Sequence, residues 1–172
     1  MPPRIILATL NAKYIHASLG LRYLLANMAR HGGADLRAMA VLREFTIRRP
    51  VQEVADALLQ ELGPPTDAVQ IVGLGVYIWN VQQTTALVRL LKVQRPQLRV
   101  VLGGPEVSHE LDTQDVVQLA DHVITGWGDV SFPQLCKALV HGPQPLMKVI
   151  AGVQPPLDEI VLPYDEYDAA DL

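Results

Sequence analysis

The sequence has very little cysteine: Cys136 is the only one among 172 residues. A single thiol excludes an internal disulfide, and it excludes a zinc or iron–sulfur site built from several cysteines of this chain. On the predicted inner face of a helix, Cys136 is expected to behave as a small apolar side chain without chemistry. Any redox chemistry must therefore use a group that this chain does not itself supply.

Long apolar runs and an excess of basic residues are also missing. No run approaches the roughly 20 residues that span a bilayer, and only five apolar residues precede the first polar ones near the N-terminus. We therefore expect a cytoplasmic protein without a membrane partner. The formal net charge is −4 and the 14 Lys and Arg are scattered, so nucleic acid is not an expected partner.

Apolar residues, in contrast, are abundant, at 49% of the chain against 19% charged residues. Short apolar runs alternate with longer segments of helical period, which is typical of a parallel sheet whose crossovers are helices. Five such units can be counted. The pattern predicts an α/β domain of the flavodoxin-like (Rossmann-like) kind, with a doubly wound five-stranded parallel sheet.

The predicted elements follow this pattern along the chain. Strands are expected at 5–9, 36–42, 69–76, 99–102 and 122–125, and helices at 17–31, 51–62, 81–94, 112–120 and after 129. Asn80, with Gln83 three residues later, resembles the N-cap pair of the third helix. We expect residues 1–142 to form the domain. Residues 143–172, rich in proline and acidic at the end, are expected to be a linker, although Lys148–Val153 could form one more strand.

In an open parallel sheet, ligands bind beyond the carboxyl ends of the strands, so the residues after each strand are informative. Glycines lie at the ends of three of the predicted strands, at 73 and 75, at 103 and 104, and at 126 and 128. A single glycine could merely make a short turn, but three strand ends with glycine together favour a ligand groove.

Other ligands of this fold fit the same positions poorly. A flavin phosphate loop would need a turn rich in Ser, Thr and Gly after the first strand, and Leu10–Tyr14 is not one. A phosphoreceiver would need an aspartate at the end of the third strand, where the sequence has Gly75-Val76-Tyr77. Gly73-Leu74-Gly75 begins like a dinucleotide fingerprint, but Ile78 stands where its third glycine would be, so strand packing is the better interpretation.

Three segments at the strand ends resemble a known family. They are Leu10–Leu25, Val101–Ser108 and Ile124–Phe132, and in this order they are similar to the N-terminal vitamin B12-binding domain of cobalamin-dependent radical S-adenosylmethionine (SAM) proteins. Leu157–Tyr164 resembles the connector that precedes the radical domain there. The resemblance implies a corrinoid over the strand ends, with its nucleotide tail between the sheet and a helix.

The resemblance also implies a set of cofactor-binding residues and no catalytic residue. Polar groups would meet corrin amides or the nucleotide phosphate, aromatic rings would cover the corrin face, and glycines would make room. The set comprises Asn11, Lys13, Tyr14, His16, Ser18, Gly73, Gly75, Tyr77, Gly103, Gly104, Pro105, Glu106, Gly126, Trp127 and Gly128. Trp79 is expected to be an ordinary core aromatic, and Glu106 to cap a helix or contact amides rather than transfer protons.

His16 is the candidate axial ligand of cobalt. Many cobalamin modules present this histidine from an Asp-x-His-x-x-Gly loop after the first strand. Here Tyr14 stands where the aspartate would be, and Gly20 is one residue too distant. A ligating histidine usually has its other ring nitrogen held by a carboxylate or carbonyl, so helix capping and a contact to the corrin rim remain open for His16.

The resemblance implies that the chain presents cobalamin to a radical SAM domain for methyl transfer or redox chemistry. That domain would bring a [4Fe–4S] cluster and S-adenosylmethionine, held by a CxxxCxxC motif that one cysteine cannot supply. The domain is therefore expected in a further segment of the polypeptide or in a partner chain. Two alternatives stay open: a stand-alone corrinoid carrier or sensor, and a flavodoxin-like domain for another small ligand.

Overall fold

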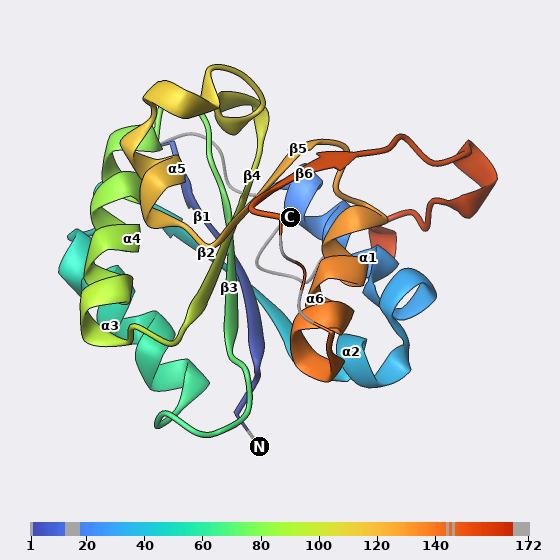
Figure 1. Ribbon diagram of the computed structural model, residues 1–172, viewed down its shortest axis with the longest axis horizontal. Helices are drawn as coiled ribbons and strands as arrows, with labels where there is room; N and C mark the ends of the chain where they lie inside the picture. The colour runs from blue at the N-terminus through green and yellow to red at the C-terminus, as the bar shows by residue number, and fades with distance from the viewer. Residues whose placement is uncertain (1, 13–17, 144, 146, 167–172) are drawn as a thin grey trace.

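The computed structural model describes residues 2–12, 18–143, 145 and 147–166. Its centre is a six-stranded sheet in the order β2-β1-β3-β4-β5-β6, in which all neighbouring strands are parallel (Figure 1). The strands are β1 Ile5–Asn11, β2 Ala40–Thr46, β3 Ile71–Gly75, β4 Arg99–Gly103, β5 His122–Gly126 and β6 Val149–Gly152. The first five strands have the flavodoxin-like order, which confirms the predicted fold class, with one strand more than expected.

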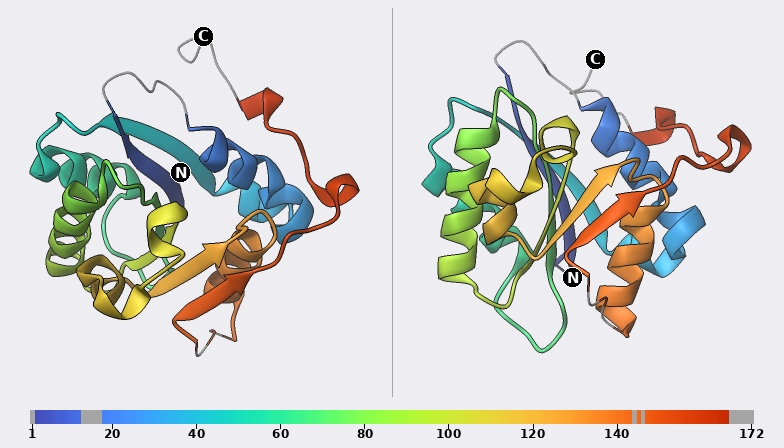
Figure 2. Two further views of the ribbon diagram at one scale, coloured as in Figure 1. Left: turned by 90° about the horizontal axis from the view of Figure 1, so that it is seen from above. Right: turned by 45° about the horizontal axis from the view of Figure 1, so that its top comes forward.

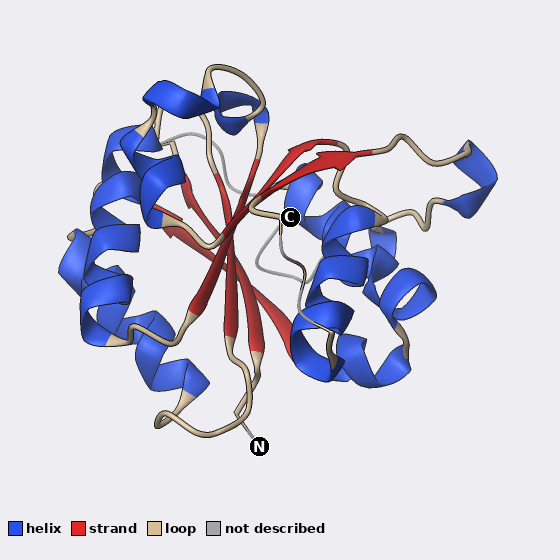
Figure 3. Cartoon of the chain, in the orientation of Figure 1, coloured by secondary structure: helices blue, strands red, loops and turns tan. Residues whose placement is uncertain are grey.

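Two layers of helices cover the sheet. One face carries α1 (Leu19–Gly32), α2 (Ala34–Ala38) and α6 (Ser131–His141), and the other carries α3 (Val51–Leu62), α4 (Val81–Gln94) and α5 (Asp115–Leu119) (Figures 2 and 3). Short 3₁₀ turns follow at η1 (Pro105–Val107), η2 (Leu111–Thr113), η3 (Leu157–Glu159) and η4 (Tyr164–Glu166). Within the described residues, no helix is long and apolar enough to cross a membrane.

The second strand lies later in the chain than predicted. Residues 36–42 were expected to form it, but Ala34–Ala38 is a short helix and β2 runs from Ala40 to Thr46. The cause is that β2 is an edge strand, paired only with β1 and largely half-buried. It contains the exposed Arg43 and also Glu44, which pairs with Arg22 of α1, so continuous apolarity does not mark it.

The sixth strand lies in the segment expected to be a linker, within Lys148–Val153, where one more strand was considered. β6 pairs in parallel with β5, from Val123 opposite Val149 to Gly126 opposite Gly152. Prolines stand on both sides of this four-residue strand, which made the whole segment look irregular. The sheet therefore continues beyond residue 142.

Candidate functional site

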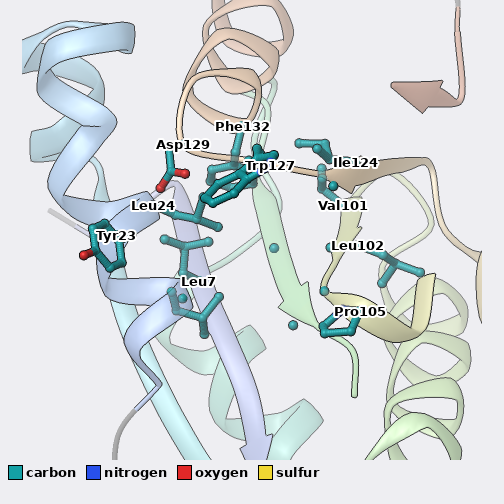
Figure 4. A pocket seen from close by; sticks show the side chains of 18 of the residues that line it. Leu7, Tyr23, Leu24, Val101, Leu102, Pro105, Ile124, Trp127, Asp129 and Phe132 are labelled. Atoms are coloured by element: carbon teal, nitrogen blue, oxygen red, sulfur yellow. The ribbon is translucent and has the colours of Figure 1, made fainter. Parts of the chain in front are cut away.

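A cavity of about 870 Å³ opens at the carboxyl ends of the strands, between the sheet and helices α1 and α6 (Figure 4). Its walls come from β1, β3, β4 and β5, from the loops after β4 and β5, and from the segment 157–162. Most lining side chains are apolar, among them Leu7, Leu24, Val101, Ile124 and Phe132. The shape and chemistry of this cavity suit a bulky ligand with apolar surface.

The cavity lies where glycines replace side chains at several positions on one face of the central strands. Side chains alternate along a strand, so Val72 and Leu74 of β3 join the core under α3 and α4, while Gly73 and Gly75 face α1 and α6. In β4, Gly103 falls on this same bare face, two residues after Val101. Glycine at Gly103 leaves free space, and glycine at Gly73 and Gly75 lets the rings of Phe132 and Tyr77 lie close to the strand.

The glycines differ in what surrounds them. A Cβ added at Gly103 would meet nothing closer than the Ile124 carbonyl oxygen at 3.9 Å, so this position opens onto free space. A Cβ at Gly73 would lie 2.9 Å from the Phe132 ring, which already fills the space above that glycine. Position 104 requires glycine because of its backbone conformation. Its φ is +110°, and a Cβ there would lie 2.5 Å from the Val76 carbonyl oxygen.

Ser108 fixes the two glycine turns against each other. Its hydroxyl donates to the Gly104 carbonyl at 3.1 Å and accepts from the Gly126 N–H at 3.2 Å. The Val76 N–H donates to the Gly103 carbonyl at 2.8 Å, which ties the loop after β3 to the end of β4. These bonds hold the rim of the cavity in one arrangement.

Asn80 holds the ends of β1 and β3 together by hydrogen bonds. The predicted N-cap bond is absent: α4 begins at Val81, but the Asn80 side chain makes no capping bond to it. Instead, its amide nitrogen donates to the carbonyls of Leu10 and Gly75, at 3.0 and 3.2 Å, and its oxygen accepts from the Tyr77 N–H at 2.8 Å. This fully buried side chain therefore clamps two strand ends beside the cavity.

Three aromatic residues lie near the rim. The rings of Tyr77 and Trp79 are stacked, with centroids 4.5 Å apart and planes 7° apart. Trp79 is 38% exposed, so the expectation that it is a core aromatic is wrong. Its ring packs against Tyr77 instead of against the core. Tyr77 and Trp127 line the cavity, and Trp127 is 48% exposed.

The structure brings together most of the predicted site residues that it describes. Those that line the cavity are Gly73, Gly75, Tyr77, Gly103, Gly104, Pro105, Gly126, Trp127 and Gly128. Asn11, Ser18 and Glu106 are not among the lining residues. The Ser18 hydroxyl accepts from the Leu21 N–H at 3.3 Å as the N-cap of α1, and its backbone N–H donates to Glu44.

The remaining predicted residues, Lys13, Tyr14 and His16, lie outside the described residues. Ligation of cobalt by His16 therefore stays a prediction. Within the part of the chain that the structure describes, no three His, Cys, Asp or Glu side chains gather in a group that could hold a metal ion. Cys136 is fully buried on the inner face of α6, as predicted, and burial raises the pKa of its thiol.

Sequence reasoning missed several walls of the cavity. Leu24 lies on the inner side of α1, and Phe132 was placed on the inner face of its helix without being connected to a site. The available signal was the alternation Val72-Gly73-Leu74-Gly75-Val76, in which every second residue is glycine. That pattern predicts a strand with one bare face.

Asp129 brings a carboxyl group to this apolar cavity. It lies between β5 and α6, is 7% exposed and lines the cavity beside Tyr23, Leu24 and Trp127 (Figure 4). Burial raises the pKa of Asp129, while its own backbone N–H and the neighbouring His31 act in the opposite direction.

The segment after β6 forms the outer wall. Asn27 of α1 is fully buried and makes two bonds with Val161: its amide nitrogen donates to the carbonyl at 3.0 Å, and its oxygen accepts from the N–H at 2.9 Å. His31 Nε2 lies 2.9 Å from the Glu159 carbonyl oxygen. Arg37 donates to Glu166 at 2.7 Å. We call residues 157–166 the strap, because they lie across α1 and close the cavity with Leu157, Ile160 and Leu162.

Comparison with known proteins adds two findings. A family model described as "B12 binding domain" matches residues 5–136, from β1 into α6. The cobalamin-dependent radical SAM methyltransferase TokK of Streptomyces tokunonensis is 29% identical over 90 residues, a stretch that covers 50% of this chain and 12% of TokK. The matched region is thus a small part of that relative.

Proposed function

Because this chain belongs to the B12-binding domain family, we propose that it binds cobalamin at the cavity and presents it to a radical SAM domain. The observation that carries the proposal is the bare face of β3 and β4, which opens a cavity of about 870 Å³ at the carboxyl edge of the sheet. This edge is where ligands of doubly wound sheets bind.

The residues present fit a corrinoid. The cavity is the size of an ordinary small-ligand site, so we assign to it the nucleotide arm, whose flat apolar base suits walls such as Leu7, Val101 and Phe132. We assign the larger corrin ring to the rim, where Gly103, Gly126 and neighbouring residues leave the backbone without bulky side chains. Bound cobalamin would supply a cobalt that carries a methyl group or electrons, and this chain would hold and orient it.

Presentation to a second domain is supported by the rim of the cavity. Leu157 is 82% exposed, Leu162 is 56% exposed and Trp127 is 48% exposed, although all three line the cavity. Exposed apolar residues grouped beside a ligand site are typical of a surface that another domain covers. We propose a radical SAM domain as this partner, because the relative TokK is named as a cobalamin-dependent radical SAM methyltransferase. In this proposal, that domain and not this chain holds the iron–sulfur cluster and S-adenosylmethionine.

The binding step is tested by anaerobic titration with hydroxocobalamin followed by desalting. We expect about one corrinoid per chain to stay with the protein and its visible spectrum to differ from that of free hydroxocobalamin. The same result is expected for Arg89→Ala, a change at an exposed position of α4 on the far side of the sheet. A desalted protein without pigment would contradict the proposal.

The presentation step has a separate test. The reading frame downstream of Leu172, and the chains encoded beside it, should contain a CxxxCxxC motif in a radical SAM domain. Co-expression of that domain should then yield a complex that Leu157→Ser weakens without loss of bound corrinoid. Absence of such a motif from both places would contradict presentation while leaving cobalamin binding intact.

A further inference from the structure

The carboxyl group of Asp129 has no evident task in the folded chain. Within the described residues it makes no ion pair, and the groups that act on it are its own backbone N–H and the neighbouring His31. The residue is only 7% exposed and lines an otherwise largely apolar cavity (Figure 4). Burying such a group costs free energy unless a partner compensates.

Helix capping does not explain this aspartate. An acidic residue just before a helix commonly accepts hydrogen bonds from the first turn, but α6 begins at Ser131, with Val130 at the N-cap and no side-chain capping bond. The first turn is closed by the backbone, because the Phe132 N–H donates to the Gly128 carbonyl at 2.9 Å. The helix therefore does not need the Asp129 carboxyl.

The partner that fits is a hydrogen-bond donor on the ligand. We propose that Asp129 accepts a hydrogen bond from a neutral hydroxyl or amide N–H on the nucleotide arm of cobalamin and so selects complete corrinoids over those that lack the arm. This inference rests on the proposed function. A phosphate is excluded as the group in contact, because two anions would repel strongly in a largely apolar cavity.

The test compares two corrinoids, hydroxocobalamin and cobinamide, of which the second lacks the nucleotide arm. In Asp129→Leu, a side chain of similar size that cannot accept, we expect the dissociation constant for hydroxocobalamin to rise by about tenfold or more. Asp129→Asn keeps one acceptor oxygen without the charge, so a smaller rise is expected. Affinity for cobinamide should stay unchanged in both variants. Asp112→Asn, in the exposed turn η2, is the matched control and should bind both corrinoids like the wild type.

Each outcome decides the question. Losses of equal size for both corrinoids, or no loss in either variant, would overturn the inference. Circular dichroism reports whether each variant is folded, and if Asp129→Leu is not, the nearly isosteric Asp129→Asn decides alone. A wild-type protein that binds neither corrinoid would contradict the proposed function itself, whereas a binding wild type with unaffected variants would contradict the role of Asp129 alone.

Discussion

The two faces of the sheet use the same strands for different purposes. On the face under α3 and α4, Val72, Leu74, Val100 and Leu102 are all buried in a continuous core. On the face under α1 and α6, the alternating positions of the same strands include glycines, and a cavity takes the place of packed side chains. Stability and binding are therefore assigned to alternate residues of one strand.

The largest effect on stability is expected from the packed face. Leu91 of α4 is fully buried there, so Leu91→Ala should lower the free energy of unfolding by about 2–5 kcal/mol, measured by urea denaturation. At temperatures where the variant is folded, its affinity for hydroxocobalamin should equal that of the wild type. A stability loss below about 1 kcal/mol, or a weakened affinity for hydroxocobalamin, would contradict the claim that this face serves stability and the other face serves binding.

Two adjacent glycines sharpen the comparison. Gly104→Ala places a side chain in the left-handed region and against the Val76 backbone, so we expect a loss of about 1–3 kcal/mol or more in thermal or urea unfolding. Gly103→Ala adds a methyl group where the nearest atom is 3.9 Å away and should change stability by less than about 1 kcal/mol. Equal losses of stability in the two variants would mean that both positions need glycine for the backbone conformation alone.

The strap extends the comparison to the outer wall of the cavity. Asn27→Leu removes both hydrogen bonds to Val161 and leaves the strap backbone without them, at a cost of about 1–3 kcal/mol. Chymotrypsin should then cleave within 157–166, after residues such as Leu157 or Tyr164, faster than in the wild type. Unchanged cleavage rates would show that Asn27 does not hold the strap.

The smallest effect concerns pH and Asp129. Burial raises the folded-state pKa of this carboxyl above its usual value near 4, so the stability it contributes is complete at lower pH and is lost as pH rises through the folded pKa. Asp129→Asn is neutral throughout, and its stability relative to the wild type should increase as pH rises from about 4 to about 8. A difference that does not change over this range would contradict the burial of the charge.

The sequence predicted the parts of the fold that have strong local signals. Helix α3 begins after Pro50 and ends before Gly63, and α4 spans 81–94, both as expected, because apolar periodicity and breaker residues mark them. The edge strand β2 was misplaced, whereas β6 falls within Lys148–Val153, which was expected only as a possible strand of the linker. Each pairs on one side only, so neither needs the continuous apolar run by which a central strand is found.

The candidate site was predicted where it follows from topology. The glycines at the ends of β3, β4 and β5 meet at one edge because parallel strands end there, and they do line the cavity. Asp129 and Ser108 were not assigned to the site, since their roles depend on which neighbours the loops bring near. Asn80 shows the same limit: its sequence context resembles a cap, but the ends of β1 and β3 lie closer to its amide.

The central claim is that the bare face of β3 and β4 holds cobalamin, and Gly103→Leu tests it most directly. The new side chain would enter free space at the cavity without a clash at its Cβ. Titrated with hydroxocobalamin beside the wild type, the variant should keep its free energy of unfolding within about 1 kcal/mol and lose at least about tenfold in affinity. A folded Gly103→Leu that retains the corrinoid as tightly as the wild type would contradict the account.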